Sequence, residues 1–224
     1  MTPLRINGLY AITPDMDDSS NLATMTRQAL MGGARLVQYR NKIANSALRL
    51  EQARLIAPLC RKFNVPLIVN DHLDLAVEIG ADGVHLGQED APVTEARRRL
   101  GAGKIIGASC YDRLELAVDA ERQGADYVAF GAFFASVTKP GAAGAPLNLL
   151  RDAKRKLHTA VVAIGGVTPN NAVELIHLGA DAVAASNALY SARDVRSAAE
   201  KFSRLFKPAK YSIPHNYELS NDLT

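Results

Sequence analysis

The sequence lacks several features that would assign it to a membrane, secreted or nucleic-acid-binding class. No apolar run approaches the roughly 18 residues that a membrane-spanning helix needs. The N-terminal stretch MTPLRINGLYAIT has one Arg and no long apolar core, so we do not expect a signal peptide. Basic residues form no long run and the net charge is only +3, which does not favour nucleic acid as a partner but suits a small anionic ligand.

Cysteine is also scarce in this chain. The two cysteines, Cys60 and Cys110, have no close spacing, which fits neither a disulfide framework nor a zinc site. We therefore interpret both as reduced thiols in a cytoplasmic protein. The composition, with 48% hydrophobic and 22% charged residues, is typical of a globular protein, and the length of 224 residues fits one α/β barrel as well as two small domains.

A tripeptide of Gly, Ala and a charged residue recurs along the chain. It occurs at Gly33-Ala34-Arg35, Gly80-Ala81-Asp82, Gly124-Ala125-Asp126 and Gly179-Ala180-Asp181. Each copy follows an amphipathic segment and precedes an apolar run, and a Gly after a helix permits a left-handed cap before a short loop into a strand. The spacings of 47, 44 and 55 residues leave room for two strand–helix units in each interval.

The remaining apolar runs complete a pattern of eight strands, each followed by a helix. We expect strands at Leu9–Thr13, Leu36–Arg40, Leu67–Asn70, Val84–Gly87, Lys104–Ser109, Tyr127–Phe133, Val161–Gly165 and Ala182–Ser186. We expect helices near residues 22–32, 46–63, 72–79, 92–100, 112–123, 148–157, 169–178 and 192–206. This order predicts an α/β protein with the (β/α)₈ TIM-barrel fold, in a single domain over residues 1–206.

The alternative architecture is a doubly wound open sheet, which the absence of a GxGxxG motif after the first strand weakens. Residues 207–224 fall outside the strand–helix pattern. They are polar and contain Pro208 and Pro214, so we interpret them as a C-terminal tail on the barrel.

The segment from Pro66 to Asp90 gives the clearest indication of a site. Its two apolar runs lead to Asn70-Asp71 and to Asp90, with a short helical segment between them. Ligands of parallel α/β folds bind at the carboxyl ends of the strands, so both carboxylates are expected at one edge. Because Mg²⁺ is usually held by one or two carboxylates with phosphate oxygens and water, Asp71 and Asp90 are candidate metal ligands. The alternative is that the two acids cap the helices that follow them.

The second strand ends in QYRNK, in which Gln38, Arg40 and Lys42 share one side at a period of two. A planar guanidinium and an ammonium together suit the oxygens of a diphosphate. The alternative is a charged loop that pairs with nearby acids. His85, by contrast, lies between two apolar residues inside the fourth strand and is more typical of a hydrogen-bonded structural histidine than of a ligand.

The ends of the later strands carry small residues, hydroxyl groups and one cation. They are Gly107 and Ser109 at the fifth strand, Ser136, Thr138 and Lys139 after the sixth, Gly165 and Gly166 after the seventh, and Ser186 and Asn187 after the eighth. Small residues let a ligand approach the backbone, and the loops after strands seven and eight commonly bind phosphate in TIM barrels. The GAAGA run after the sixth strand suits a lid, with an ordinary surface loop as the alternative.

Six of these motifs, in this order and spacing, resemble the thiamine phosphate synthase family. They are QYRNK, NDHLDLA, GVHLGQED, IGAS, SVTK and VAIGGVTPNN, and the resemblance covers residues 8–200. The family joins 4-amino-2-methyl-5-hydroxymethylpyrimidine diphosphate to 4-methyl-5-hydroxyethylthiazole phosphate, which releases diphosphate and leaves thiamine phosphate. The resemblance implies this transferase activity and Mg²⁺ as the cofactor.

The resemblance also implies roles for individual residues. The substrate-binding residues would be Gln38, Tyr39, Arg40, Asn41, Lys42, Asn70, Ser109 and Lys139 for the pyrimidine diphosphate, and Ser136, Val137, Thr138, Gly166, Ser186 and Asn187 for the thiazole phosphate. Arg40, Lys42, Ser109 and Lys139 would be catalytic, and Asp71 and Asp90 would hold Mg²⁺.

Three features depart from the family pattern. Ser136 stands where the family usually has Thr, which keeps the hydroxyl group. Ser186-Asn187 stands where a hydrophobic residue followed by Ser is more usual, a change that is tolerable where backbone N–H groups hold the phosphate. The tail after Phe206 has no counterpart in the family pattern.

Three other functions stay open from the sequence alone. A thiazole tautomerase would not need the metal pair, and a non-catalytic protein that binds thiamine phosphate would not need it either. An aldolase-type barrel would use Lys42 or Lys139 as a Schiff base. The expected partners are small phosphorylated substrates rather than nucleic acid or a membrane, and the sequence leaves a homo-oligomer open.

Overall fold

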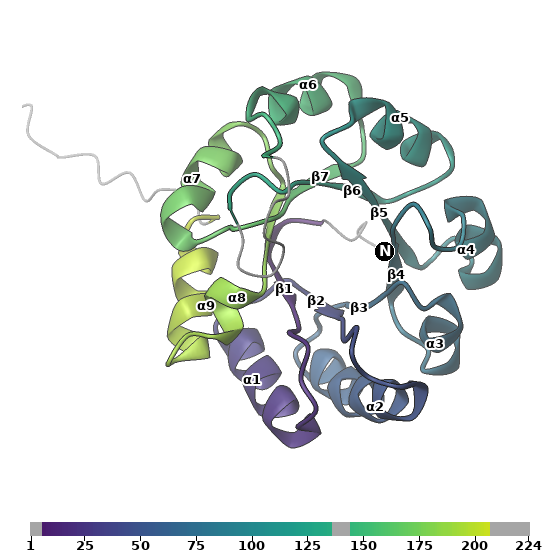
Figure 1. Cartoon of the computed structure of the whole chain (residues 1–224), viewed down its shortest axis with the longest axis vertical. Helices are drawn as coiled ribbons and strands as arrows, with labels where there is room; N and C mark the ends of the chain where they lie inside the picture. The colour runs from purple at the N-terminus through teal and green to yellow at the C-terminus, as the bar shows by residue number, and fades with distance from the viewer. Residues whose placement is uncertain (1–5, 136–143, 207–224) are drawn as a thin grey trace, which may run out of the picture.

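The computed structural model describes residues 6–135 and 144–206. In these residues, eight parallel strands form a closed barrel in which each strand pairs with the next and β8 pairs with β1 (Figure 1). The strands are β1 (Gly8–Ile12), β2 (Leu36–Tyr39), β3 (Leu67–Asn70), β4 (Gly83–Leu86), β5 (Ile105–Tyr111), β6 (Tyr127–Phe130), β7 (Ala160–Ala163) and β8 (Ala182–Ala185). The predicted TIM-barrel fold is confirmed.

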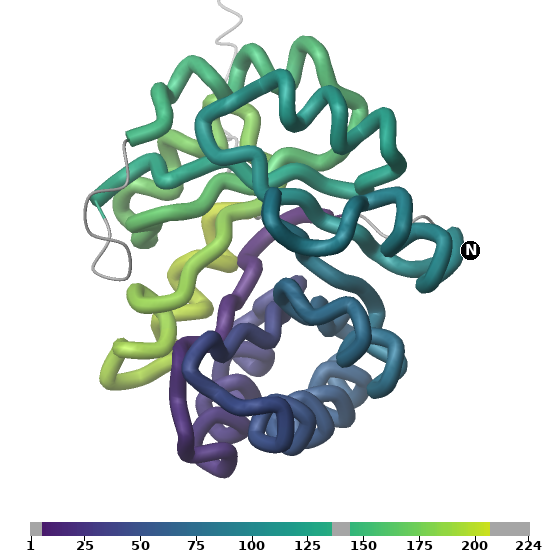
Figure 2. The backbone as a smooth tube through the Cα atoms, turned by 45° about the vertical axis from the view of Figure 1, so that its right-hand side comes forward, coloured from purple at the N-terminus to yellow at the C-terminus, as the bar shows by residue number. Residues whose placement is uncertain are grey.

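Helices surround the barrel and connect successive strands (Figure 1). They are α1 (Ser19–Met31), α2 (Ser46–Lys62), α3 (Leu73–Glu78), α4 (Val93–Leu100), α5 (Leu114–Arg122), α6 (Asn148–Lys156), α7 (Pro169–His177), α8 (Asn187–Tyr190) and α9 (Val195–Arg204). In Figure 2 the N-terminal β1 runs beside the C-terminal part of the described chain, where it pairs with β8 and closes the ring.

Side chains alternate between two hydrophobic clusters along each strand, as a period of two requires. One cluster fills the barrel interior and includes Tyr10, Ile68, Tyr127 and Val162. The other lies between the strands and the helices and includes the neighbouring residues Leu9, Val69, Val128 and Val161. Because both faces of the strands are buried, the strand sequences are continuous apolar runs, which is why the sequence revealed them.

The Gly-Ala-Asp tripeptides form the predicted turns and have a second role. Gly80, Gly124 and Gly179 all have positive φ angles, of 63°, 95° and 110°, which glycine adopts without strain. The Asp of each tripeptide accepts a hydrogen bond from a backbone N–H near the start of the adjacent strand. The pairs are Leu67 N to Asp82 Oδ2 at 2.9 Å, Ile106 N to Asp126 Oδ2 at 2.7 Å and Val161 N to Asp181 Oδ2 at 2.8 Å. The tripeptides therefore tie neighbouring strands together at the amino-terminal end of the barrel.

Most predicted elements differ from the structure by one to three residues at their ends, and three differences are informative. The sixth strand ends at Phe130 rather than Phe133, because at Gly131 the backbone turns close to β7, where a Cβ would lie 2.1 Å from the Ile164 carbonyl oxygen. The fifth strand extends to Tyr111 through a register shift against β6. The predicted helix near residues 192–206 is α9, which begins where Asp194 accepts a hydrogen bond from the Ser197 N–H, and a short helix that was not predicted, α8, precedes it.

Among the described residues, none of the helices combines the length and the apolar character that crossing a membrane requires. The predicted tail, residues 207–224, lies outside the described residues.

We expect Asp126→Ala to lower the free energy of unfolding by about 1 to 2 kcal/mol, because the buried Ile106 N–H loses its acceptor. Arg97, whose Nη2 lies 2.6 Å from Asp126 Oδ2, would lose an ion pair as well. Urea unfolding followed by circular dichroism measures the change. Glu174→Ala, which removes an exposed carboxylate from α7, is the control and should shift stability by less than about 0.5 kcal/mol. Equal midpoints for the two variants would contradict the role assigned to Asp126.

Candidate active site

Most of the predicted site residues meet at the carboxyl-terminal mouth of the barrel, because closure brings the ends of all eight parallel strands together. Gln38 lies on β2, Asn70 and Asp71 lie at the end of β3, and Asp90 lies on the loop after β4. Ser109 lies on β5, Gly166 on the loop after β7 and Ser186 on the loop after β8. Ser136, Val137, Thr138 and Lys139 lie outside the described residues.

Asp71 and Asp90 form an interacting pair of carboxyl groups at this mouth. Burial and the neighbouring Asp71 carboxylate both raise the pKa of Asp90, whereas the hydrogen bond from the Gly87 N–H to Asp90 Oδ2, at 2.6 Å, opposes them. Asp71 has a φ angle of 59°, and its backbone N–H donates to the carbonyl oxygen of His85 on β4. Strand β3 therefore delivers Asp71 to the edge of β4, where Asp90 also lies.

The alternative that these acids cap helices is wrong for both. The N-cap positions of α3 and α4 are His72 and Pro92, and neither helix has a side-chain cap hydrogen bond. Asp90 instead accepts its hydrogen bond from Gly87, inside its own loop. The two carboxylates are thus not used to satisfy helix N-termini.

The donor set of this pair suits a divalent cation. Burial and the Asp71 carboxylate both disfavour the charged form of Asp90 and raise its pKa, and a cation between the two carboxylates would offset both effects. The described residues contain no group of three or more His, Cys, Asp or Glu side chains arranged to hold a metal ion. An ion at Asp71 and Asp90 would therefore depend on ligand oxygens and water for the rest of its coordination, which is the usual arrangement for Mg²⁺ at phosphate sites.

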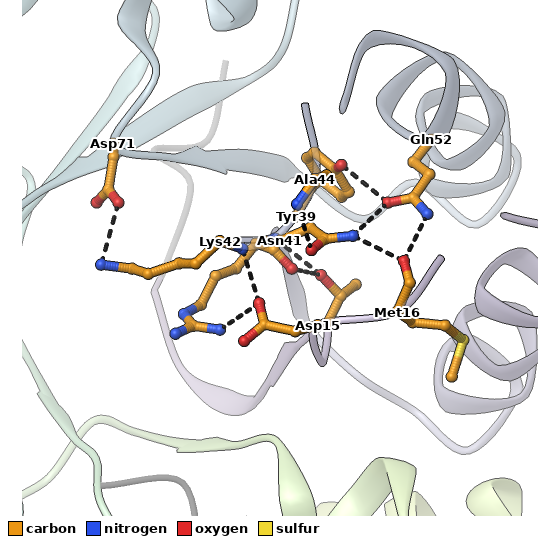
Figure 3. A network of polar contacts seen from close by, with 10 residues as sticks. Asp15, Met16, Tyr39, Asn41, Lys42, Ala44, Gln52 and Asp71 are labelled. Atoms are coloured by element: carbon orange, nitrogen blue, oxygen red, sulfur yellow. Dashed lines mark hydrogen bonds and ion pairs between the residues drawn. The ribbon is translucent and has the colours of Figure 1, made fainter. Parts of the chain in front are cut away.

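The loop after β2 carries two cations, of which Lys42 contacts this pair. The Lys42 Nζ atom is 3.4 Å from Asp71 Oδ2, and its side chain is 55% exposed, so it remains accessible at the mouth (Figure 3). Arg40 Nη1 is 2.9 Å from Asp15 Oδ1, and the same carboxylate oxygen accepts a hydrogen bond from the Lys42 backbone N–H at 2.7 Å. Asp15 therefore holds the loop that carries both cations. Both cations pair with nearby carboxylates, as the alternative interpretation of QYRNK expected, and the anion site stays a prediction.

Tyr39 and Asn41 lie on either side of Arg40 in the sequence, and their side chains reach Gln52 on α2 (Figure 3). The Tyr39 hydroxyl donates to Gln52 Oε1 on α2 at 2.9 Å. Asn41 Nδ2 donates to the Met16 carbonyl oxygen at 2.7 Å and to Gln52 Oε1 at 3.0 Å. Both side chains are buried and already bonded to protein groups, so they support the loop, and a ligand contact from these positions would have to involve the backbone.

Polar side chains also cross the barrel interior below the mouth. Gln38 Nε2 donates to the Tyr10 hydroxyl at 3.0 Å, and the Tyr10 and Tyr127 hydroxyl groups are 2.7 Å apart. His85 Nδ1 lies 2.9 Å from the Tyr127 hydroxyl, and His85 Nε2 lies 2.9 Å from Ser109 Oγ. The interpretation of His85 as a hydrogen-bonded histidine is confirmed.

The opposite side of the mouth is formed by the loops after β7 and β8, which are paired strands. Gly166 has a φ angle of 62°, and a Cβ there would lie 2.4 Å from the Ala135 carbonyl oxygen, so only glycine fits. Asn171 Nδ2 donates to the Gly166 carbonyl oxygen at 3.0 Å, and a capping box of Thr168 and Asn171 begins α7. These contacts fix the start of α7 beside Gly166, where the sequence predicts a phosphate site.

A separate polar hollow of about 340 Å³ lies at the amino-terminal end of the barrel. Its lining includes Asp126, Asp181 and Lys154, and Lys154 Nζ is 2.8 Å from Asp181 Oδ2. These carboxylates are the ones that bind strand N–H groups, so the hollow belongs to the framework of the barrel.

Sequence reasoning missed Asp15, Gln52, Tyr10 and Tyr127. Asp15 and Gln52 act only through contacts between segments far apart in the sequence, which no local motif records. Tyr10 and Tyr127 did carry a signal: each occupies an inward-facing position of its strand, where a hydroxyl group must find a buried partner.

Comparisons with known proteins agree with this arrangement. A family model described as thiamine monophosphate synthase matches residues 9–189. The thiamine-phosphate synthase of Nitrosospira multiformis is 62% identical over 202 residues, which cover 90% of this chain and 86% of that protein. The thiamine-phosphate synthase of Nitrosomonas eutropha is 54% identical over 206 residues, 92% of this chain and 97% of that protein.

Solved structures lead to the same family. The thiamine phosphate pyrophosphorylase of Pyrococcus furiosus superposes with a TM-score of 0.81 at 35% identity, over 90% of this chain and 96% of that chain. A 3-hexulose-6-phosphate synthase superposes with a TM-score of 0.68 at 17% identity, which shows only the shared barrel fold. The resemblance that the strand-end motifs indicated is thus confirmed, and the chain belongs to the thiamine monophosphate synthase family and is a transferase of thiamine biosynthesis.

Proposed function

We propose that this chain condenses 4-amino-2-methyl-5-hydroxymethylpyrimidine diphosphate with 4-methyl-5-hydroxyethylthiazole phosphate, with Mg²⁺ at Asp71 and Asp90. The observation that carries the proposal is the interacting carboxylate pair at the mouth, with the Lys42 ammonium 3.4 Å from Asp71. A tautomerase or a non-catalytic binding protein would have no use for this combination of anions and cations. The names of the relatives support the synthase as well.

The proposed reaction breaks the bond between the pyrimidine methylene carbon and the diphosphate oxygen. The electron pair leaves with the diphosphate, and the methylene cation is captured by the thiazole nitrogen. Bound Mg²⁺ would supply neutralising charge for the leaving diphosphate. The chain's own part is to place Arg40 and Lys42 against the diphosphate oxygens, where their charges favour the increase in negative charge as the bond breaks.

The neutral polar residues would position the substrates. In this proposal Gln38, Asn70 and Ser109 bind the pyrimidine diphosphate, together with Lys139 from the segment outside the described residues. Since the described side chains offer hydrogen bonds and charge but the reaction requires no protein nucleophile, catalysis would rest on positioning and electrostatics. Tyr39 and Asn41 would contribute by holding the loop that carries Arg40 and Lys42.

The thiazole phosphate would bind at the loops after β7 and β8. Gly166 and the Ser186-Asn187 pair would supply backbone N–H groups, with Ser136, Val137 and Thr138 completing the site from the segment outside the described residues. The substitution of Ser186-Asn187 for the more usual residues suits a site that relies on backbone donors. We also propose that residues 1–206 are the catalytic domain of a cytoplasmic enzyme whose partners are these small phosphorylated substrates.

The direct test is to incubate the purified protein with both phosphorylated precursors, with and without Mg²⁺, and to measure thiamine phosphate and diphosphate by chromatography. We expect equimolar formation of both products in the presence of Mg²⁺. Consumption of the thiazole phosphate alone would instead indicate a tautomerase, and binding of thiamine phosphate without turnover would indicate a binding protein.

Asp71→Ala should lower kcat/KM by about 100-fold or more and abolish the response to Mg²⁺, because one of two protein carboxylates on the ion is lost. Asp90→Ala should weaken the response strongly. The control is Asp74→Ala, which removes a carboxylate that is 90% exposed on α3, three residues from Asp71. Initial rates measured across a Mg²⁺ titration report the effect. Turnover of Asp71→Ala near that of the parent would refute the metal assignment.

Asn187→Asp should raise the KM for the thiazole phosphate about tenfold and leave the KM for the pyrimidine diphosphate nearly unchanged, because it adds a negative charge of similar shape beside one phosphate only. Asn64→Asp is the matched control, since it adds the same charge at an exposed position at the other end of the barrel. Substitution of Gly166 is unsuitable, because any Cβ meets the backbone of Phe134 and Ala135. Equal changes in both KM values would place the phosphate elsewhere.

A chain that ends at Lys207 should keep most of its activity and its Tm. The last described helix, α9, ends at Arg204, and all strand-end motifs precede it. Enzyme assays and thermal unfolding of the shortened chain test this. Loss of turnover at an unchanged Tm would mean that residues of the tail act at the active site.

A further inference from the structure

Five side chains form a continuous hydrogen-bonded series through the barrel interior, which we call the interior chain: Gln38, Tyr10, Tyr127, His85 and Ser109. The successive distances are 3.0, 2.7, 2.9 and 2.9 Å. It crosses from β2 to β5 by way of β1, β6 and β4. Its two ends are residues to which the proposed function gives contacts with the pyrimidine diphosphate, so the inference below rests on that proposed function.

The hydrogen bonds of the interior chain can all run in one direction. Gln38 donates its amide N–H to the Tyr10 oxygen, so the Tyr10 proton is available for the Tyr127 oxygen. Burial raises the pKa of both phenols well above the usual value, so each keeps its single proton. In this direction Tyr127 would donate to His85 Nδ1, and the ring proton of His85 would lie on Nε2.

The last step of this sequence concerns Ser109. With its proton on Nε2, His85 donates to Ser109 Oγ, and the serine hydroxyl must direct its own proton elsewhere. Ser109 is only partly buried at the end of β5, so its proton is available to a ligand at the mouth. At the other end, Gln38 uses Nε2 inside the barrel, which leaves its Oε1 atom as an acceptor for a ligand donor such as an exocyclic amino group.

The barrel is shaped to hold these aromatic rings. A Cβ at Gly107 would lie 2.0 Å from the Tyr127 Cζ atom, so the Tyr127 ring occupies space that any other residue at 107 would fill. The Tyr127 ring packs edge-on against Tyr10, with centroids 5.8 Å apart, and is stacked with His85 at 5.5 Å. The phenol oxygens are therefore held in place by packing as well as by hydrogen bonds.

Stability alone does not require this arrangement. TIM-barrel interiors are usually filled by branched aliphatic side chains, and each buried hydroxyl carries a desolvation cost that its hydrogen bond only offsets. We propose that Tyr10 and Tyr127 are positioning residues for the transferase reaction. They orient the Gln38 amide so that its Oε1 atom faces the substrate as an acceptor. Through His85, they also orient the Ser109 hydroxyl so that it donates its proton to the substrate.

The direction of the chain is tested first, by NMR of protein labelled with ¹⁵N-histidine, with His85→Asn used to assign the signal. We expect His85 to carry a proton on Nε2 and none on Nδ1. In Tyr127→Phe, which removes the donor to Nδ1, a mixture of the two tautomers should appear. A proton on Nδ1 in the parent protein would overturn the proposal. This measurement does not require turnover, so it stands even if the proposed reaction is not observed.

The functional consequence is tested by the binding of each substrate to Tyr10→Phe and Tyr127→Phe, measured by calorimetry with Mg²⁺ present. Each variant should bind the pyrimidine diphosphate about tenfold more weakly, as the loss of one oriented hydrogen bond predicts, and should bind the thiazole phosphate as the parent does. Tyr190→Phe is the control, because it removes another buried hydroxyl, 3.4 Å from Thr26 Oγ1, outside the barrel interior.

A structural role alone would give a different result. In that case Tyr10→Phe and Tyr127→Phe would lower the Tm as Tyr190→Phe does and would leave the binding of the pyrimidine diphosphate unchanged. Alternatively, both variants would weaken the binding of the two substrates equally. Either outcome would overturn the proposal. Should Tyr127→Phe fail to fold, Tyr10→Phe alone decides the matter, since it breaks the link between Gln38 and the rest of the chain while leaving the ring beside Gly107 in place.

Discussion

The alternation of side chains along eight short parallel strands is the constraint on which both the core and the active site depend. Outward residues such as Val69 and Val128 pack under the helices, while inward residues such as Tyr10 and Tyr127 fill the barrel. A shift of one residue in any strand would exchange the two sets. The Asp side chains of the Gly-Ala-Asp tripeptides oppose such a shift, because each binds a particular N–H group of the adjacent strand.

The mouth of the barrel balances charges of both signs before any ligand is present. Asp15 pairs with Arg40, and Lys42 lies beside Asp71, so the cations that suit a diphosphate are held in place by carboxylates. Burial and the neighbouring Asp71 carboxylate together raise the pKa of Asp90, so the pair is not fully compensated by Lys42. A ligand that brings both phosphate groups and a divalent cation would satisfy the two sets of charges together.

The fold and much of the site could be predicted from the sequence because both produce local patterns. Each strand is a continuous apolar run, and polar residues follow at the strand ends. Closure of the barrel brings these strand ends together at one mouth, so the polar residues can be expected to lie near one another. The orientations of the Tyr39 and Asn41 side chains could not be predicted, because they depend on hydrogen bonds to Gln52, which lies on α2. The short α8 was missed because four residues are too few to show a helical period.

Gly107 and Tyr127 share one space in the barrel interior. The smallest side chain added at position 107 would overlap the tyrosine ring, so position 107 must stay glycine as long as position 127 keeps an aromatic ring. A larger residue at position 107 would require a smaller side chain at position 127, and this would remove the phenol that connects Tyr10 on β1 to His85 on β4. The dependence runs in one direction, because loss of the Tyr127 hydroxyl alone would leave the ring and its packing against Gly107 in place.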